Sequence, residues 1–80
     1  MAVLRLFAAA RDAAGTGRDD VPGTTVAEVL HAARTRYGPG FTAVLERCQV
    51  WLNGETAPPQ TAVVDDDEVA VLPPVSGGLS

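Results

Sequence analysis

Few residues of this sequence are of the types that carry conventional catalysis or metal binding. His31 is the only histidine and Cys48 the only cysteine. His31 falls outside the apolar positions of its predicted helix, so we expect a solvated side chain. Two such residues are too few for a zinc site, and nothing in the spacing makes Cys48 a nucleophile with His31 as its base. The acidic run 65–68 lacks the spacing and the glycine of a calcium loop, and predicts a solvated turn.

The C-terminal segment carries a pattern with a chemical use. Ser76, Gly77 and Gly78 follow the double proline at positions 73 and 74. Glycines have no side chain, so a segment built on them is thin enough to thread a narrow channel and deliver a carboxylate to another protein's active site. The prolines would stiffen the base of this segment and aim it. The competing interpretation is a frayed chain end.

Length and composition narrow the function classes. A chain of 80 residues makes one domain with little room for a deep catalytic cleft, so an enzyme that works alone is disfavoured. The net charge of −4, with arginines and no lysine, argues against nucleic-acid binding and permits docking on a basic protein surface. No apolar run reaches the roughly 20 residues of a membrane span, and no signal-peptide pattern is present. With a single cysteine, these features predict a cytoplasmic protein.

The order of the predicted elements indicates how the C-terminal segment is held. A capping box at Thr25 and Glu28 begins a helix with one apolar stripe, and the run 69–72 predicts a buried central strand parallel to the first, itself mostly buried. The predicted strands cover 2–8, part of 16–23, 49–53, 55–57 and 69–72; the predicted helices cover 8–15, 26–37 and 41–45. This order predicts an α+β fold of the β-grasp type, a mixed sheet of about five strands with one main helix across it. We expect the domain to cover 1–74 and a flexible C-terminal tail to cover 75–80.

Four sequence blocks, in this order along the whole chain, carry a family resemblance. They are VLRLFAAARDAAG, TTVAEVL, VWLNGE and DDDEVAVLPPVSGG. The chain resembles the MoaD/ThiS group of ubiquitin-like sulfur carriers, and more closely MoaD, the small subunit of molybdopterin synthase. The last block is the specific part, because an acidic turn, a short apolar strand and PPVSGG occur together.

The resemblance implies a function in molybdenum cofactor biosynthesis. An E1-like, MoeB-like enzyme would use ATP to adenylate the carboxylate of Gly78, and a sulfur donor would then convert it to a thiocarboxylate. The tail would enter a MoaE-like large subunit that holds the catalytic pocket, and the chain itself would bind no cofactor or metal. Besides Gly77 in the tail, the resemblance implies partner-binding residues at the tail's base: Phe7, Leu72, Pro73, Pro74, Val75 and Ser76. For Leu72, plain core packing is an equally good interpretation.

Two departures from the family pattern and two alternatives accompany this interpretation. Leu79 and Ser80 follow Gly78 and block its carboxylate, so we expect a peptidase to remove them; an added extension, or loss of the carrier function, would also explain them. Asp66 stands where the family usually has glycine. One alternative is a sulfur carrier for thiamine, cysteine or a sulfur-containing secondary metabolite. The other is a ubiquitin-like interaction or conjugating module without a sulfur role.

Overall fold

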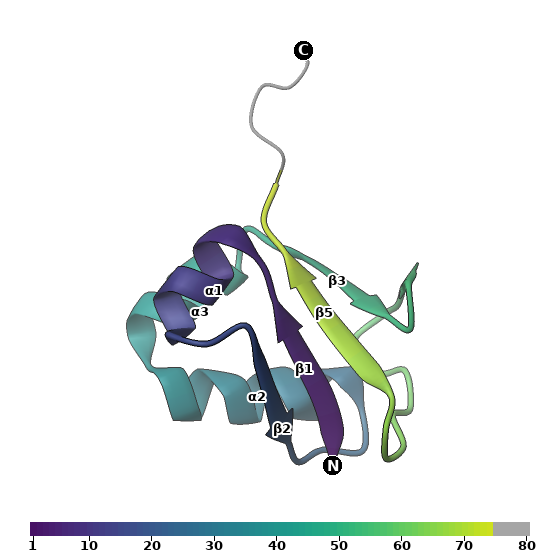
Figure 1. Ribbon diagram of the computed structural model, residues 1–80. Coiled ribbons are helices and arrows are strands. Elements are labelled where there is room, and N and C mark those ends of the chain that lie inside the picture. The colour runs from purple at the N-terminus through teal and green to yellow at the C-terminus, as the bar shows by residue number, and fades with distance from the viewer. Residues whose placement is uncertain (75–80) are drawn as a thin grey trace.

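The two ends of the described chain meet in the middle of one sheet. The computed structural model describes residues 1–74, which form strands β1 (Ala2–Leu6), β2 (Arg18–Val21), β3 (Gln49–Leu52), β4 (Glu55–Thr56) and β5 (Glu68–Leu72), and helices α1 (Ala8–Ala14), α2 (Val26–Tyr37) and α3 (Pro39–Leu45). The strand order is β2-β1-β5-β3-β4. β5 is parallel to β1 and antiparallel to β3. Figure 1 shows β5 leading from the centre of the sheet to the base of the tail. The predicted β-grasp topology, with a parallel central strand, is confirmed.

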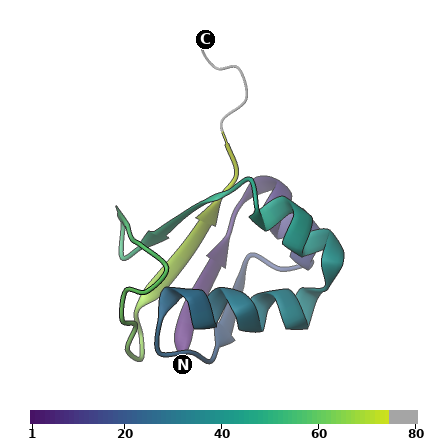
Figure 2. The same ribbon diagram turned by 180° about the vertical axis from the view of Figure 1, so that it is seen from behind.

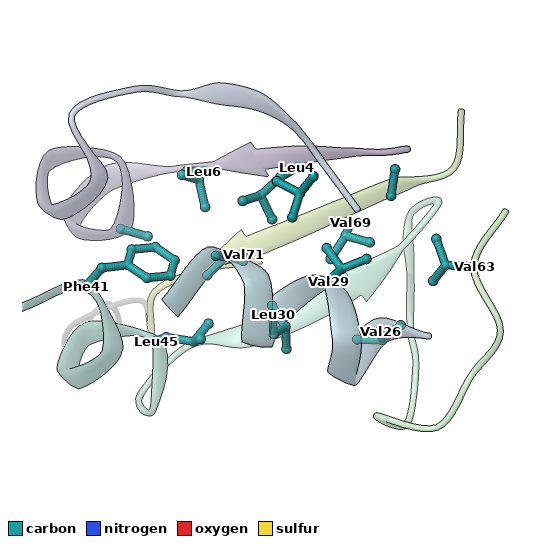
Figure 3. Packing of buried hydrophobic residues seen from close by; sticks show 14 residues of the cluster. Leu4, Leu6, Val26, Val29, Leu30, Phe41, Leu45, Val63, Val69 and Val71 are labelled. Carbon is teal, nitrogen blue, oxygen red and sulfur yellow. The ribbon is translucent and has the colours of Figure 1, made fainter. Parts of the chain in front are cut away.

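The helices lie on one face of this sheet, as Figure 2 shows from behind. Leu4 and Leu6 of β1 and Val69 and Val71 of β5 point to this face and are almost fully buried. Phe41 of α3 lies at the end of the cluster with Leu6 and Val71, as Figure 3 shows, and its ring meets that of Tyr37 edge-on at 5.2 Å between centroids. The buried core therefore lies between the sheet and the helices, and its fourteen apolar members are Ala2, Leu4, Leu6, Ala10, Val21, Val26, Val29, Leu30, Ala33, Phe41, Leu45, Val63, Val69 and Val71.

The other face of the sheet is only half-buried, which corrects the prediction of a fully buried central strand. Val3 and Arg5 of β1 and Ala70 and Leu72 of β5 alternate with the core residues and are of intermediate exposure. The first strand is mostly buried, as predicted, whereas the apolar run of β5 marks a central strand that is buried on one side only. The cause is the single layer of helices: in the described part of the chain, Figure 1 shows no helix on the second face.

Local sequence signals set where the helices begin and end. The amide of Glu28 donates to Thr25 Oγ1 at 3.1 Å, which is half of the predicted capping box. The second hydrogen bond of a capping box would join the Glu28 carboxylate to the amide of Thr25. Here the carboxylate accepts from the amide of Thr24 instead, at 2.8 Å. The hydrogen bonds from Thr24 hold the pKa of Glu28 below its usual value. Gly38, at φ 89°, ends α2 and lets α3 start at once.

The first strand is shorter than predicted, and this shapes the base of the tail. β1 ends at Leu6, whereas the prediction extended it to Ala8. Phe7 is the extended N-cap residue of α1, and Ala8 begins that helix with a φ of 50°. A non-glycine residue at positive φ is uncommon, and here it turns the chain sharply from the sheet into α1. Phe7 is therefore left at the corner between β1 and α1.

The turns at the opposite end of the sheet are tied together by side-chain hydrogen bonds. Asn53 and Gly54 both have positive φ, as the predicted two-residue turn requires. The side chain of Asn53 donates to Asp67 at 3.1 Å and accepts from the amide of Glu68 at 2.8 Å. Asp67 also accepts from the amide of Val64, and these bonds lower its pKa. The acidic run is thus a hydrogen-bonded turn into β5.

No helix in residues 1–74 is long and apolar enough to cross a membrane.

Candidate functional site

The candidate site is the base of the tail, where β5 leaves the sheet. The register pairs Leu6 with Val71 in two adjacent parallel strands. Phe7 and Leu72 come directly after these two residues, so both lie at the same end of the sheet. Pro73 and Pro74 come directly after β5, and neither has an amide hydrogen with which to extend the strand pairing. The central strand therefore ends at Leu72 and directs the following chain away from the sheet, as Figure 1 shows up to Pro74.

Phe7 is an exposed aromatic side chain at this end. Phe7 is 39% exposed, although phenylalanine is a residue that folding normally buries. The guanidinium carbon of Arg5 lies 5.6 Å from the ring centroid, within cation–π range. Arg5 also donates to Glu68 Oε2 at 3.1 Å across the strand pair. These contacts hold a flat apolar ring at the surface beside the start of the tail.

Leu72 and Pro73 are half-buried and Pro74 is exposed. Leu72 pairs with Gln49 on the open face of the sheet, opposite to the face that buries Val71. It belongs neither to the buried core nor to the partly buried residues packed against that core. Leu72 is therefore not a member of the buried core, and its partner-binding role stays a prediction. Together with Phe7 it supplies apolar surface at the tail's base.

A groove on the helix side of the tail's base was not predicted. It has a volume of about 350 Å³ and is lined by Ala9 of α1, Ala43 and Val44 of α3, Arg47, Pro73 and Pro74. The helix residues that line it, Ala9, Ala43 and Val44, have small side chains, which leaves space where α1 and α3 meet. Alanine-rich helices show no marked periodicity, so the only signal in the sequence was the unusual run AAARDAA before the first glycine.

The residues that a conventional active site would use are not arranged for one. His31 is exposed on α2, as predicted. The thiol of Cys48 is partly buried and donates to the carbonyl of Val44 at 3.2 Å. Burial raises the pKa of this thiol, which keeps it protonated and a weak nucleophile. Within residues 1–74, no group of three metal-ligating side chains comes together.

The remaining predicted site residues lie outside the described part of the chain. These are Val75, Ser76, Gly77 and Gly78, with Leu79 and Ser80 after them. Of the predicted partner-binding set, residues 1–74 contain Phe7, Leu72, Pro73 and Pro74, and all four lie at the tail's base.

Comparison with solved structures assigns the class of protein. The crystal structure of SAMP1 from Haloferax volcanii is 34% identical, with coverage of 96% of this chain and 98% of that one and a TM-score of 0.79. A putative molybdopterin converting factor subunit 1 from Pyrococcus furiosus is 22% identical, with coverage of 92% and 97% and a TM-score of 0.80. A complex of BexX and CysO from Amycolatopsis orientalis contains a chain that is 23% identical, with coverage of 98% and 100% and a TM-score of 0.82. The fold is that of the ubiquitin-like β-grasp proteins.

The family follows from the sequence match. The model of the ThiS family matches residues 4–78 and so spans nearly the whole chain, from β1 to Gly78. The chain therefore belongs to the ThiS family, the ubiquitin-like sulfur carriers of ThiS/MoaD type. The resemblance seen in the four sequence blocks is confirmed at this level.

Proposed function

We propose that this protein is the sulfur-donating small subunit of a molybdopterin synthase. The observation that carries the proposal is the block DDDEVAVLPPVSGG: its apolar strand is the central β5, and its double proline leaves the sheet beside an exposed phenylalanine. A carrier needs a rigid domain with an accessible end and no catalytic groups of its own. Residues 1–74 form a compact domain whose central strand ends at the double proline, and membership of the ThiS family supports the proposal.

The proposed chemistry takes place at the carboxylate of Gly78. An oxygen of that carboxylate attacks the α-phosphorus of ATP on an E1-like, MoeB-like enzyme, and pyrophosphate leaves. A sulfur donor then attacks the acyl carbon, and AMP leaves with the electron pair of the broken C–O bond. The product is a thiocarboxylate whose sulfur is the nucleophile in the MoaE-like large subunit. The carrier supplies the sulfur, and the partners supply the pockets and the ATP; such chemistry fits a cytoplasmic protein.

The carboxylate of Gly78 must be free before this chemistry can start. Leu79 and Ser80 hold it in a peptide bond, so the proposal requires a peptidase that cleaves after Gly78. Hydrolysis of that bond adds one water and releases the dipeptide. The role of Gly77 is to keep the segment before the reactive carbon free of a side chain.

The docking surface we propose has an apolar part and a basic rim. Phe7, Leu72, Pro73 and Pro74 form the apolar part in the described chain, and Val75 and Ser76 are proposed to continue it along the tail. Aromatic and aliphatic anchors that are exposed in the free protein and desolvated in a complex are typical of binding hot spots. Arg5, held over the ring of Phe7, adds a charge at the edge of this surface.

Mass spectrometry tests the carrier function directly. The form ending at Gly78 is incubated with ATP, sulfide and an E1-like enzyme, and the 80-residue form serves as the matched control. The expected result is a gain equal to the difference between sulfur and oxygen in the shorter form alone. The absence of any gain in the Gly78-ending form would refute a carrier role. Reconstitution with a MoaE-like protein and a pterin precursor then tests the pathway.

Two of the structural neighbours support alternative functions within the same class of protein. A CysO chain has been crystallised with BexX, and this supports a carrier that serves a different partner in another sulfur pathway. The likeness to SAMP1, a small archaeal modifier protein, supports conjugation of the Gly78 carboxylate to amines. A thiocarboxylate that is consumed without a MoaE-like protein would favour the former. Adducts on target lysines without a thiocarboxylate would favour the latter.

A further inference from the structure

The groove between α1 and α3 has the shape and polarity of a binding site for part of another protein. Its walls are apolar apart from one residue, Arg47, and the prolines of the tail's base close one side. Its volume of about 350 Å³ is at the low end of the range of small-molecule sites, roughly 300–1,000 Å³. Ala9 and Ala43, both exposed, give it a shallow floor. A site of this size and lining is suited to one or two aliphatic side chains.

The charge at the rim indicates what should accompany those side chains. Arg47 is exposed, and within residues 1–74 no carboxylate lies within 4 Å of its guanidinium. Its sequence neighbour Glu46 is also exposed and does not pair with it. By contrast, Arg5 and Arg36 are each paired with a carboxylate. A guanidinium that has no carboxylate partner within residues 1–74 and lies beside an apolar groove favours a carboxylate on the occupant.

The distribution of charge over the whole domain points the same way. Arg18 lies opposite Arg5 in the sheet register, near the end at which β5 stops. The Arg11 side chain lies against Gly17, the residue before Arg18. The acidic turn with Asp65 and Asp67 lies at the opposite end, beside the N-terminus, as Figure 1 shows. Arg11, Arg18 and Arg47 are thus exposed toward the end at which β5 stops, although Asp12 and Glu46 lie beside two of them, and these guanidinium groups would attract a carboxylate on a partner.

We propose that this groove binds a protein segment in which a leucine-like side chain lies next to a carboxylate. The aliphatic side chain contacts Ala9, Ala43, Val44 and the two prolines, and the carboxylate pairs with Arg47. The groove lies on the helix side of the tail's base, whereas Phe7 and Leu72 lie on the sheet side. A partner that uses both would hold the tail's base from two sides. The identity of the partner as the protein that receives the tail rests on the proposed function. The binding of such a segment in the groove does not depend on that function.

A titration followed by amide NMR shifts tests the groove without any enzyme. The probe is a capped peptide of two leucines flanked by glutamates, added to the labelled full chain; the control peptide has lysines in place of the glutamates. We expect millimolar binding of the acidic peptide, with shifts at Ala9, Ala43, Val44 and Arg47. Shifts confined to another surface, no shifts at saturating peptide, or equal binding of the basic peptide would each overturn the proposal.

Two variants and a matched control sharpen the titration. Ala43→Trp fills the groove, and Arg47→Glu reverses its one charge; each should weaken the acidic peptide by about tenfold or more. Arg34→Glu makes the same charge change on α2, which contributes no lining residue, and should leave the affinity within about twofold. Far-UV circular dichroism establishes that each variant is folded. If Arg34→Glu weakens binding as much as Arg47→Glu, the attraction is general and the groove proposal is wrong.

The same variants separate this proposal from the proposed function. If the Gly78-ending form gains no sulfur but the peptide titration succeeds, the carrier role fails and the groove stands. If sulfur is gained and the titration fails, the groove proposal alone is wrong. Where both succeed, Arg47→Glu should raise the KM for the carrier in adenylation with little change in kcat, because the residues that line the groove are not the residues that react.

Discussion

The two faces of the sheet are built from alternate residues of the same strands, yet only one is covered by helices. On the covered face Leu4, Val69 and Val71 are fully buried, and together with buried residues of the helices they form one apolar core. On the open face Ala70 and Leu72 are half-buried and Arg5 bonds to Glu68. The covered face thus supplies most of the stabilisation from burial, while the open face, with the tail's base, is available to other proteins.

The largest effect expected is on stability, from a change on the covered face. Phe41→Ala removes a ring with no exposed surface and should lower the free energy of unfolding by about 3–5 kcal/mol. Urea unfolding followed by the fluorescence of Trp51 measures it. Val3→Ala on the open face is the control, with an expected loss below about 1 kcal/mol. Equal losses from the two variants would show that the faces do not differ as described.

The next effect is on function, from a change at the open end. Phe7→Asp removes an exposed anchor and should lower sulfur transfer to the pterin precursor in the proposed large subunit by about tenfold or more, roughly 1.4 kcal/mol. The free energy of unfolding should change little, since Phe7 is already 39% exposed. Single-turnover transfer from thiocarboxylated protein provides the measurement. Unimpaired transfer by Phe7→Asp would remove this residue from the docking surface.

A smaller loss of stability is expected where α2 meets the edge of the sheet. The hydroxyl of Tyr37 and the guanidinium of Arg36 both donate to Asp19 of β2. Tyr37→Phe removes one charge-assisted hydrogen bond from a partly exposed site, which should reduce the free energy of unfolding by about 1 kcal/mol. Thermal unfolding compares it with the wild type. A loss as large as that of Phe41→Ala would contradict the dominance of the apolar core.

The pH dependence of that loss tests its cause. The bonds from Tyr37 and then Arg36 hold the pKa of Asp19 below its usual value, while burial and Asp19 raise the pKa of Tyr37 to about 12. The stabilisation from ionised Asp19 is complete above the unfolded pKa of roughly 3.9 and is lost as the pH falls through the lower folded value. The gap between wild type and Tyr37→Phe should therefore be constant from about pH 5 to 8 and shrink in acid. Unfolding midpoints of the two proteins, measured from about pH 8 down into acid, test this expectation. A difference in stability that persists after Asp19 is protonated would argue against the pairing.

The smallest effect expected is a gain, at the acidic turn. Asp66 has a φ of 72°, in the region that glycine enters without steric cost. Asp66→Gly should raise the free energy of unfolding by a few tenths to about 1 kcal/mol, because relief of the strained backbone outweighs the greater freedom of the unfolded chain. Chemical denaturation suffices to detect it. A clear loss would mean that the Asp66 side chain makes up for the strain.

The sequence predicted the topology of the sheet but not which sides of its strands are covered. Hydrophobic runs and turn residues, such as Asn53-Gly54, are local signals, and the structure confirms them. The apolar run of β5 does not reveal whether one layer of helices covers the sheet or two, so half-burial was missed. Phe7 at the tail's base came from family resemblance. The groove depends on how α1 meets α3, and small side chains such as Ala43 leave no pattern from which this meeting could be predicted.

The pairing of β1 with β5 also bears on how the protein comes into being. Leu4 lies opposite Val69, so the central pair joins segments that are translated first and last in the described chain. Closing such a large loop delays folding, and a nascent chain lacks the middle of its sheet until β5 has left the ribosome. An incomplete translation product therefore cannot form the domain. A folded molecule, by its very topology, is one in which synthesis has already reached the base of the tail.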